Sequence, residues 1–438
     1  MPTYKKEKQQ KRASSLRSTG QESKEINKVN AAKKSNSKPA DAVKKGNVKP
    51  VDTAKKSDAK FFCPIEKKCG GCTLLSVPYE KQLEQKLDAL TKTLAGVAKP
   101  ERIIGAAHPL HYRNKITATF GRDKNGVILG LYEEKSHRVV QNDGCLIEDE
   151  RAAAVLATIK KLVASFKLTV YSEVSGYGLL KHVQIRTSRT TNEMMVVLVC
   201  AGPVFPSKNN FAKALKTAHP EITTLVLNIN DKDTTMVMGE RNITVFGPGF
   251  IEDELCGNRY RISPGSFYQV NPEQTKVLYE TAIDFAGLTG REHVVDAYCG
   301  TGTIALSAAA KCGRVTGVEL NRTAVKDAVR NAKANIIENA IFIAGDAGKY
   351  LTECAANSEK IDVVFMDPPR SGSTSEFILS CVKLAPSRIV YVSCEPTTLA
   401  RDLALFKRHG YIAAKCVGVD MFPQTENCEV ICCLYHKK

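Results

Sequence analysis

The chain has 438 residues, of which 43% are hydrophobic, and its formal net charge is +17. This length is enough for two or three domains with a sizeable core, but no stretch approaches the roughly 20 uninterrupted apolar residues of a membrane-spanning helix. No amino-terminal segment resembles a signal peptide, and 15 cysteines in such a chain argue against a disulfide framework. We therefore expect a cytoplasmic globular protein with neither a membrane partner nor an obligate protein partner.

Residues 1–60 form a lysine-rich segment with 17 Lys and Arg against 6 Asp and Glu. Such a segment cannot bury enough apolar surface to offset chain entropy, so we predict that it is disordered. A lysine-rich arm would bind phosphate backbones in a salt-sensitive manner. A solubilising tail without a partner explains the same composition equally well.

Residues 61–98 begin with a cysteine motif and continue into a predicted helix. Cys63 is followed by Cys69-Gly70-Gly71-Cys72, in which the glycines permit a tight turn. Cys69 and Cys72 can therefore share one metal centre, as in iron–sulfur proteins. Zinc uses the same Cys-x-x-Cys spacing, so the residues alone leave both metals open.

Residues 99–262 read as an antiparallel α+β domain. The strand-like stretches are residues 115–120, 127–132, 182–187, 194–199 and 224–230. Arg113, Lys115 and Lys181 lie near predicted strand starts, where basic side chains could contact phosphates. A solvated strand edge is the alternative for each of them.

Residues 263–438 alternate short apolar runs with amphipathic stretches, which predicts a parallel, doubly wound α/β sheet. Ligands of such sheets bind beyond the carboxyl ends of the strands. Chemically distinctive residues stand at these predicted ends: Tyr298, Gly300, Glu319, Asp346, Asp367 and Cys394.

The first predicted strand of this sheet runs into a glycine turn at Gly300 and Gly302. Glu319 follows Gly300 by 19 positions, at the end of the next strand, where an acid can accept both ribose hydroxyls of an adenosine. An ordinary turn and a solvated acid would explain each feature singly. The third glycine of Gly-x-Gly-x-x-Gly is missing, which favours S-adenosylmethionine over a dinucleotide.

Asp367-Pro368-Pro369-Arg370 follows a buried strand, and the prolines hold the carboxylate at the sheet rim. Methyltransferases that act on amino groups have an aromatic residue after a similar Asp-Pro-Pro. Arg370 argues against that class.

Cys394 ends a strand and is followed at once by polar residues, unlike cysteines that we assign to the core: Cys381, Cys416, Cys432 and Cys433. We expect the final strand to be inserted antiparallel, so that Glu429 begins at the rim where Cys394 ends. Glu426 is nearly as good a base candidate by spacing. A thiol and a base on one rim suit methylation of uracil carbon 5, which needs thiolate addition at carbon 6 and later removal of the carbon 5 proton.

These motifs resemble the RNA 5-methyluridine methyltransferase family over roughly residues 61–438. The resemblance implies that Cys394 is the nucleophile, that Glu429 is the proton-abstracting base, and that the target uridine is flipped out of its stack. The family often has His-Val-Glu where this chain has Asn427-Cys428-Glu429. The residues that we expect to bind S-adenosylmethionine are Gln269, Tyr298, Gly300, Glu319, Asp346 and Asp367.

The resemblance also bears on the metal and the RNA. Family members similar to this chain carry a 4Fe–4S cluster with a downstream fourth ligand, which implies the ligands Cys63, Cys69, Cys72 and Cys145. Relatives with a cluster mostly modify large-subunit ribosomal RNA, so we expect 23S rRNA as the partner, with the T-loop of tRNA as the alternative. A non-catalytic iron–sulfur RNA-binding protein is a further alternative, which the intact Cys394, Asp367 and Glu319 disfavour.

Overall fold

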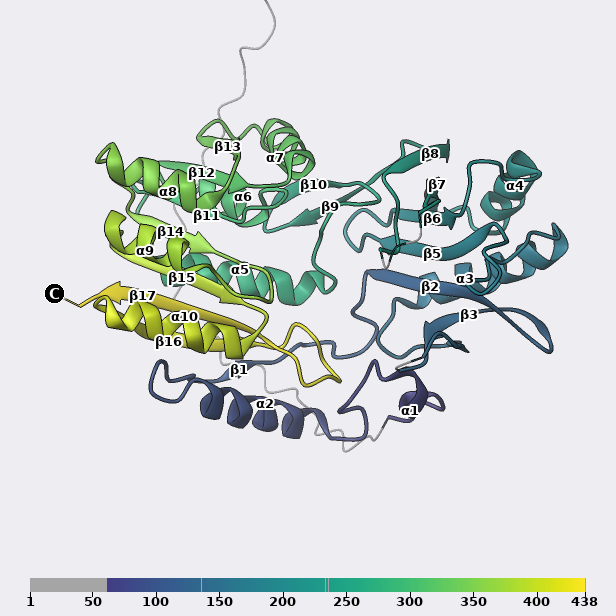
Figure 1. The fold of residues 1–438 in the computed structure, drawn as a ribbon, viewed down its shortest axis with the longest axis horizontal. Helices are drawn as coiled ribbons and strands as arrows, with labels where there is room; N and C mark the ends of the chain where they lie inside the picture. Colours follow the sequence, from purple (N-terminus) through teal and green to yellow (C-terminus); the bar gives the residue numbers. More distant parts are fainter. Residues whose placement is uncertain (1–60, 135, 233, 235, 438) are drawn as a thin grey trace, which may run out of the picture. The chain divides into compact units, whose positions relative to one another are not determined.

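The computed structural model describes residues 61–134, 136–232, 234 and 236–437 (Figure 1). The lysine-rich segment 1–60, which we predicted to be disordered, lies outside the described residues. Among the helices of the described part, none is long and apolar enough to cross a membrane.

An eight-stranded sheet forms the carboxy-terminal half, in the order β1-β16-β17-β15-β14-β11-β12-β13 (Figure 1). Five consecutive strands of this sheet are parallel: β11 (His293–Ala297), β12 (Arg314–Glu319), β13 (Ala340–Ala344), β14 (Val363–Met366) and β15 (Arg388–Ser393). The last strand, β17 (Glu429–His436), is inserted antiparallel between β15 and β16 (Tyr411–Val419). The predicted parallel sheet and its inserted antiparallel strand are both confirmed.

Helices cover both faces of this sheet because successive strand residues point to opposite sides. Val294 and Val363 belong to one buried core, with side chains of α5 (Pro272–Ala286), α6 (Thr303–Ala309) and α7 (Arg322–Ala334). Their neighbours Val295 and Val364 belong to a second core, with side chains of α8 (Ala347–Ala356), α9 (Ser375–Leu384) and α10 (Pro396–Arg408). Burial on both faces explains why these strands are apolar without alternation.

Two elements near the amino terminus join this sheet. The short strand β1 (Ile103–Ile104) pairs parallel with β16, and Leu90 of α2 (Tyr79–Thr93) is buried in the second core. Our division into residues 61–98 and 99–262 did not foresee this, because a two-residue strand has no periodicity to detect.

A seven-stranded sheet forms the central part, in the order β4-β3-β2-β5-β6-β7-β8. Its strands are β2 (Lys115–Asp123), β3 (Gly126–Tyr132), β4 (Val139–Gln141), β5 (Leu180–Thr187), β6 (Met194–Cys200), β7 (Ile222–Ile229) and β8 (Arg241–Phe246). Buried residues of α3 (Glu150–Ser165) and α4 (Lys208–Ala218) complete its core. The expected antiparallel order is wrong for one pair, since β6 and β7 are parallel. Helix α4 lies between them and supplies the crossover that a parallel pair requires.

The remaining elements are short. Helix α1 (Glu66–Cys69) lies within the cysteine motif, and the hairpin β9 (Ile251–Leu255) with β10 (Asn258–Ile262) precedes α5 and β11 along the chain.

Candidate active site and cysteine cavity

The register of the large sheet brings Cys394 and Glu429 to the same edge. Ser393, the last residue of β15, is opposite Val430 in the antiparallel pair, so Cys394 and Glu429 are opposite each other one residue further along, at the same end of the ladder. Strand β14 runs parallel to β15 and pairs Met366 with Tyr391, which carries Asp367 to the same rim. The predicted meeting of thiol and carboxylates therefore follows from strand pairing alone.

The pKa of Cys394 is affected by the same neighbouring residues. Its thiol is half-buried, and burial raises its pKa to about 11, with the nearby Glu429 and Asp367 adding to the shift. The positive charge of Arg370 acts in the opposite direction. Because the thiolate is the reactive form, a cation close to Cys394 favours its activation. The charge of a sulfonium cofactor would act in the same sense as Arg370.

Glu429 and Asp367 are two acids that interact electrostatically at this rim. Glu429 is only 3% exposed. Burial raises the pKa of both carboxyls, and the charge of Asp367 raises that of Glu429 further, against the lowering effect of Arg370. Because two negative charges repel each other where little water screens them, one of two neighbouring buried carboxyls tends to keep its proton. A carboxyl shifted toward neutrality is suited to accept and release a proton.

We predicted no role in the site for Arg370, which also lies at this rim. We used it only to argue against amino-group methyltransferases. Its position one residue after the two prolines, at the end of β14, could have suggested that it shares the rim with Asp367.

The predicted cofactor loop follows β11. Tyr298 adopts a left-handed conformation with φ of 67°, and its hydroxyl lies 3.0 Å from the Ser373 hydroxyl. Its ring packs against Phe377 at a centroid distance of 5.3 Å. A non-glycine residue in this region is strained, and such strain gathers where the fold fixes a side chain for a ligand.

Gly300 and Glu319 contact each other directly. The backbone amide of Gly300 donates to one carboxylate oxygen of Glu319 at 3.1 Å, and the amide of Asn321 donates to the other at 2.7 Å. A Cβ placed on Gly300 would meet no atom within 4 Å. The predicted pairing of a glycine turn with an acid at the next strand end is therefore present, and open space lies beside the turn.

The two remaining predicted cofactor residues lie differently. Asp346 is exposed and caps α8, where its carboxylate accepts from the Lys349 amide at 2.9 Å. It follows β13, whose Ala344 pairs with Glu319, so it belongs to the same rim. Gln269 lies in the segment between β10 and α5, outside the sheet, with its backbone carbonyl accepting from the Asn114 side chain at 3.1 Å.

Asp296, within β11, is a further acid to which the sequence assigned no role of its own. It is 1% exposed; one carboxylate oxygen accepts from the Ala305 amide at 2.9 Å, while the other has no hydrogen-bond partner among the described residues. Burial raises its pKa well above the usual range. The contact ties the first turn of α6 to β11.

All four cysteines of the predicted metal motif line one cavity of about 240 Å³: Cys63, Cys69, Cys72 and Cys145. Burial, with contributions from Cys145 and Cys69, raises the pKa of Cys72 to about 12, so these thiols lie within electrostatic range of one another. Among the described residues, no three His, Cys, Asp or Glu side chains are grouped so as to hold a metal ion.

Arg113 and Lys115 also line the cysteine cavity. We had predicted that these two side chains contact phosphate or lie on a solvated strand edge. The structure instead places them on the wall of the cavity, beside the thiols.

The chain is similar to the Pyrococcus abyssi tRNA (uracil-54, C5)-methyltransferase, whose structure contains S-adenosyl-L-homocysteine, with 27% identity, a TM-score of 0.71 and coverage of 83% of this chain and 85% of that one. The fold and rim thus define an S-adenosylmethionine-dependent methyltransferase.

The sequence model of the tRNA (uracil-5-)-methyltransferase family matches residues 78–437. Relatives include uncharacterized RNA methyltransferases of Caldanaerobacter subterraneus (40% identical, covering 84% of this chain and 82% of the relative) and Halalkalibacterium halodurans (39%, 85% and 82%). The chain belongs to this family and is an RNA methyltransferase of the uracil-5 type, which confirms the predicted family.

Proposed function

We propose that this protein methylates carbon 5 of one uridine in 23S rRNA through a covalent intermediate on Cys394, with Glu429 as the base. The observation that carries the mechanism is that Cys394 and Glu429 stand opposite each other, one residue beyond the Ser393–Val430 pair at the same end of the ladder. A thiol beside a buried carboxyl suits the two demands of this chemistry, which are addition to the ring and later loss of a ring proton.

The proposed reaction has two bond-forming steps. The Cys394 thiolate adds to carbon 6 of the flipped uracil, and the resulting enolate attacks the methyl group of the sulfonium, which releases S-adenosylhomocysteine. Glu429 then takes the proton from carbon 5, the carbon 5–carbon 6 double bond re-forms, and the Cys394 sulfur leaves. Arg370 would stabilise the thiolate before addition, because its charge already opposes the upward shift of the Cys394 pKa.

The cofactor would lie over the glycine turn. Glu319 would exchange its contact with the Gly300 amide for the ribose hydroxyls, and Tyr298 would contact the adenosine or the sulfonium side. Gln269, Asp346 and Asp367 complete the proposed set of cofactor-binding residues.

The cysteine cavity fits a 4Fe–4S cluster. Such a cluster takes four thiolates, and four cysteines line this one cavity, two of them from Cys-x-x-Cys. A cluster separates its ligand sulfurs more widely than a single zinc ion does, so the thiols need not converge on one point. When bound, the cluster would fasten the motif at residues 63–72 to Cys145.

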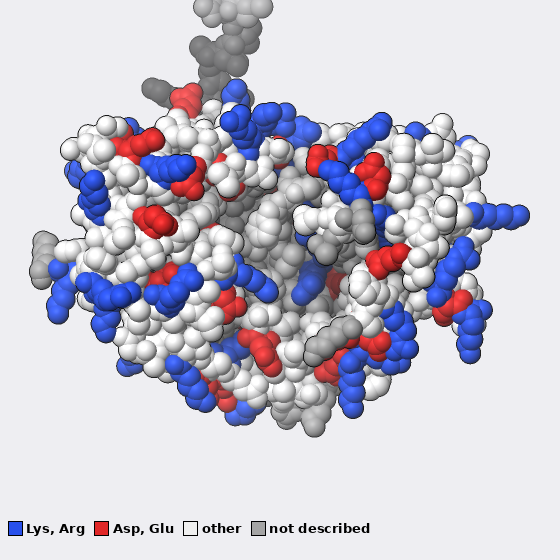
Figure 2. All heavy atoms as spheres, in the orientation of Figure 1, with Lys and Arg blue, Asp and Glu red and all other residues white. Residues whose placement is uncertain are grey.

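The proposal of 23S rRNA rests on this cysteine set, since the family resemblance noted in the sequence implies that members with a cluster mostly act on ribosomal RNA. A tRNA T-loop is the second candidate, favoured by the likeness to the Pyrococcus abyssi enzyme. Outside the tail, 46 Lys and Arg stand against 40 Asp and Glu. Figure 2 shows these charges interspersed around a hollow in one face, so RNA binding would depend on local contacts more than on overall charge.

Unmodified transcripts of 23S rRNA and of a tRNA, incubated with labelled S-adenosylmethionine and digested to nucleosides, test the substrate. We expect 5-methyluridine in the ribosomal transcript; 5-methyluridine confined to the tRNA would move the assignment to the second candidate.

Cys394→Ala tests the mechanism, with the fully buried core cysteine Cys381→Ala as the matched control. We expect Cys394→Ala to bind cofactor without methyl transfer, and Cys381→Ala to retain transfer. Turnover by Cys394→Ala would overturn the covalent mechanism.

A further inference from the structure

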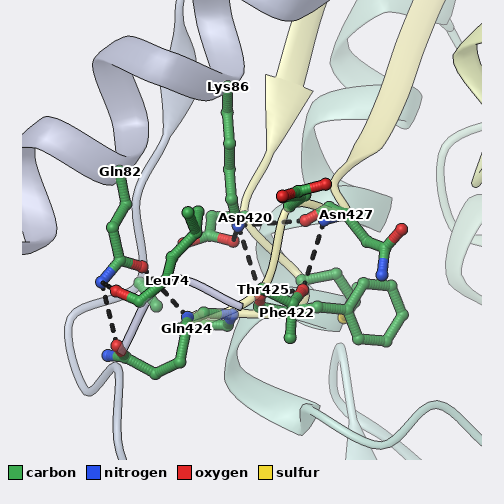
Figure 3. Close-up of polar contacts among 12 residues, drawn as sticks. Leu74, Gln82, Lys86, Asp420, Phe422, Gln424, Thr425 and Asn427 are labelled. Atoms are coloured by element: carbon green, nitrogen blue, oxygen red, sulfur yellow. Dashed lines mark hydrogen bonds and ion pairs between the residues drawn. The ribbon is translucent and has the colours of Figure 1, made fainter. Parts of the chain in front are cut away.

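The loop between β16 and β17, residues 420–428, leads directly into Glu429. This β16–β17 loop is contacted by α2 and by the segment that follows the cysteine motif (Figure 3). Neither contact could be anticipated from sequence, because the partners lie more than 300 residues apart along the chain.

Lys86 of α2 holds both ends of the β16–β17 loop. Its side chain is 1% exposed, and its ammonium contacts the Asp420 carboxylate at 2.5 Å, the Phe422 carbonyl at 3.2 Å and the Asn427 carbonyl at 3.0 Å (Figure 3). The three donors of a lysine are thereby all used. Asn427 is two residues before Glu429, so one side chain fixes the loop where it leaves β16 and where it enters β17.

The segment after Cys72 holds the middle of the same loop. The amides of Thr73 and Leu74 both donate to the Gln424 carbonyl, at 3.0 and 3.1 Å. The Glu426 amide donates to the Thr73 hydroxyl at 3.2 Å. Thr73 follows Cys72 directly, so the cysteine motif and the β16–β17 loop are joined by backbone contacts.

A buried ion pair is an expensive way to stabilise a loop. Removing two charges from water costs about as much as their attraction returns, and apolar residues of similar size often stabilise a protein more. The side chains of Lys86 and Asp420 are nevertheless 1% and 0% exposed. The Lys86 ammonium donates three directional hydrogen bonds and so fixes the position of the loop, whereas an apolar side chain would only fill the space.

We propose that Lys86, together with Thr73, is a positioning residue for Glu429, and that the segment following the cysteine motif thereby controls proton abstraction from carbon 5. This inference rests on the function proposed above and deepens it. Neither residue touches the reacting atoms. Loosening the β16–β17 loop displaces the Glu429 carboxylate, while Cys394, which follows β15 directly, keeps its place. Thiolate addition and methyl transfer therefore continue, and the proton transfer to Glu429 with release of the Cys394 sulfur is slowed.

A double-label assay separates the two steps. RNA transcribed with uridine carrying tritium at carbon 5 is incubated with S-adenosylmethionine carrying a ¹⁴C methyl group, under single-turnover conditions. Methyl transfer is read as ¹⁴C in RNA, and proton abstraction as tritium released to water. The ratio of tritium to methyl does not depend on how much of the protein is folded, so a merely structural defect leaves it unchanged.

We expect Lys86→Met to lower the rate of tritium release relative to methyl transfer by ~10-fold or more, as loss of a placed general base does. Thr73→Val, at an exposed position, should lower the ratio less and in the same direction. If Lys86→Met does not fold, Lys86→Met with Asp420→Asn removes the unpaired charge and serves in its place. Leu215→Ala, in the core of the central sheet, is the control for general destabilisation and should keep the wild-type ratio.

The outcomes separate this inference from the proposed function. If Glu429→Gln keeps the wild-type ratio, the assignment of the base fails. If Glu429→Gln lowers the ratio while Lys86→Met and Thr73→Val keep it, the positioning role is overturned and the proposed function stands.

Discussion

Replacement by alanine should affect two glycines of the cofactor loop differently: Gly302→Ala chiefly lowers stability, and Gly300→Ala chiefly weakens cofactor binding. Gly300 and Gly302 both have positive φ, at 55° and 83°, so an alanine at either position adopts a left-handed conformation at a cost of ~1–2 kcal/mol. At Gly302 the new Cβ would also lie 2.9 Å from two ring carbons of Phe342 and 3.2 Å from the Ala328 Cβ. Overpacking of this kind costs a further ~1–3 kcal/mol.

The sum for Gly302→Ala is a loss of ~2–5 kcal/mol in the free energy of unfolding. Gly300→Ala should lose only the strain, because its Cβ enters open space. That space is where we place the cofactor, so Gly300→Ala should weaken S-adenosylmethionine binding by ~10-fold or more, a loss of about 1.4 kcal/mol.

Urea unfolding followed by circular dichroism measures the first quantity, and titration calorimetry with S-adenosylmethionine measures the second. Wild-type cofactor affinity in Gly300→Ala would refute the placement of the cofactor over the turn. Equal stability of the two variants would refute the packing argument at Gly302.

Three further predictions concern the acids and the cysteines. Glu319→Ala should raise the dissociation constant of S-adenosylmethionine by ~10–100-fold, the loss of ~1.5–3 kcal/mol expected for hydrogen bonds to a charged group, and calorimetry with an intact melting transition checks it. The pKa of Glu429 is higher in the folded than in the unfolded protein, so the folded state holds this proton more tightly. The protonated carboxyl therefore contributes stability at low pH, and this contribution is lost as the pH rises through the raised pKa. The difference in melting temperature between Glu429→Gln and wild type should therefore grow in favour of the variant from about pH 5 to about pH 9, and a constant difference would contradict the raised pKa. Cys145→Ser should lose most iron after anaerobic reconstitution, measured by metal analysis, whereas Cys256→Ser, a half-buried cysteine outside the cavity, should keep it.

The positions of Glu319, Asp367 and Cys394 were predictable because strand ends of a parallel sheet share one edge. Apolar runs of four to six residues identified the strands, and this rule placed the residues that follow them. Glu429 was predictable from the same rule once the last strand was expected to be antiparallel.

Contacts between distant segments were not predictable in this way. Lys86 looks like an ordinary polar residue of an amphipathic helix, and only the fold shows it paired with Asp420. Arg113 seemed to be a surface residue at a strand start, yet it lines the cysteine cavity. Local patterns specify elements and their ends, whereas the partner of a buried charge depends on how the elements pack.

A stable complex with RNA that contains 5-fluorouridine tests the central claim most directly. Fluorine at carbon 5 cannot be removed as a proton, so the enzyme that has added its thiolate and transferred the methyl group is trapped. Digestion and mass spectrometry of the complex should find a methylated fluorouridine nucleotide on the peptide containing Cys394, and Cys394→Ala should form no complex. A nucleotide attached to any other residue, or methylation of normal RNA by an enzyme that never forms the complex, would contradict the account.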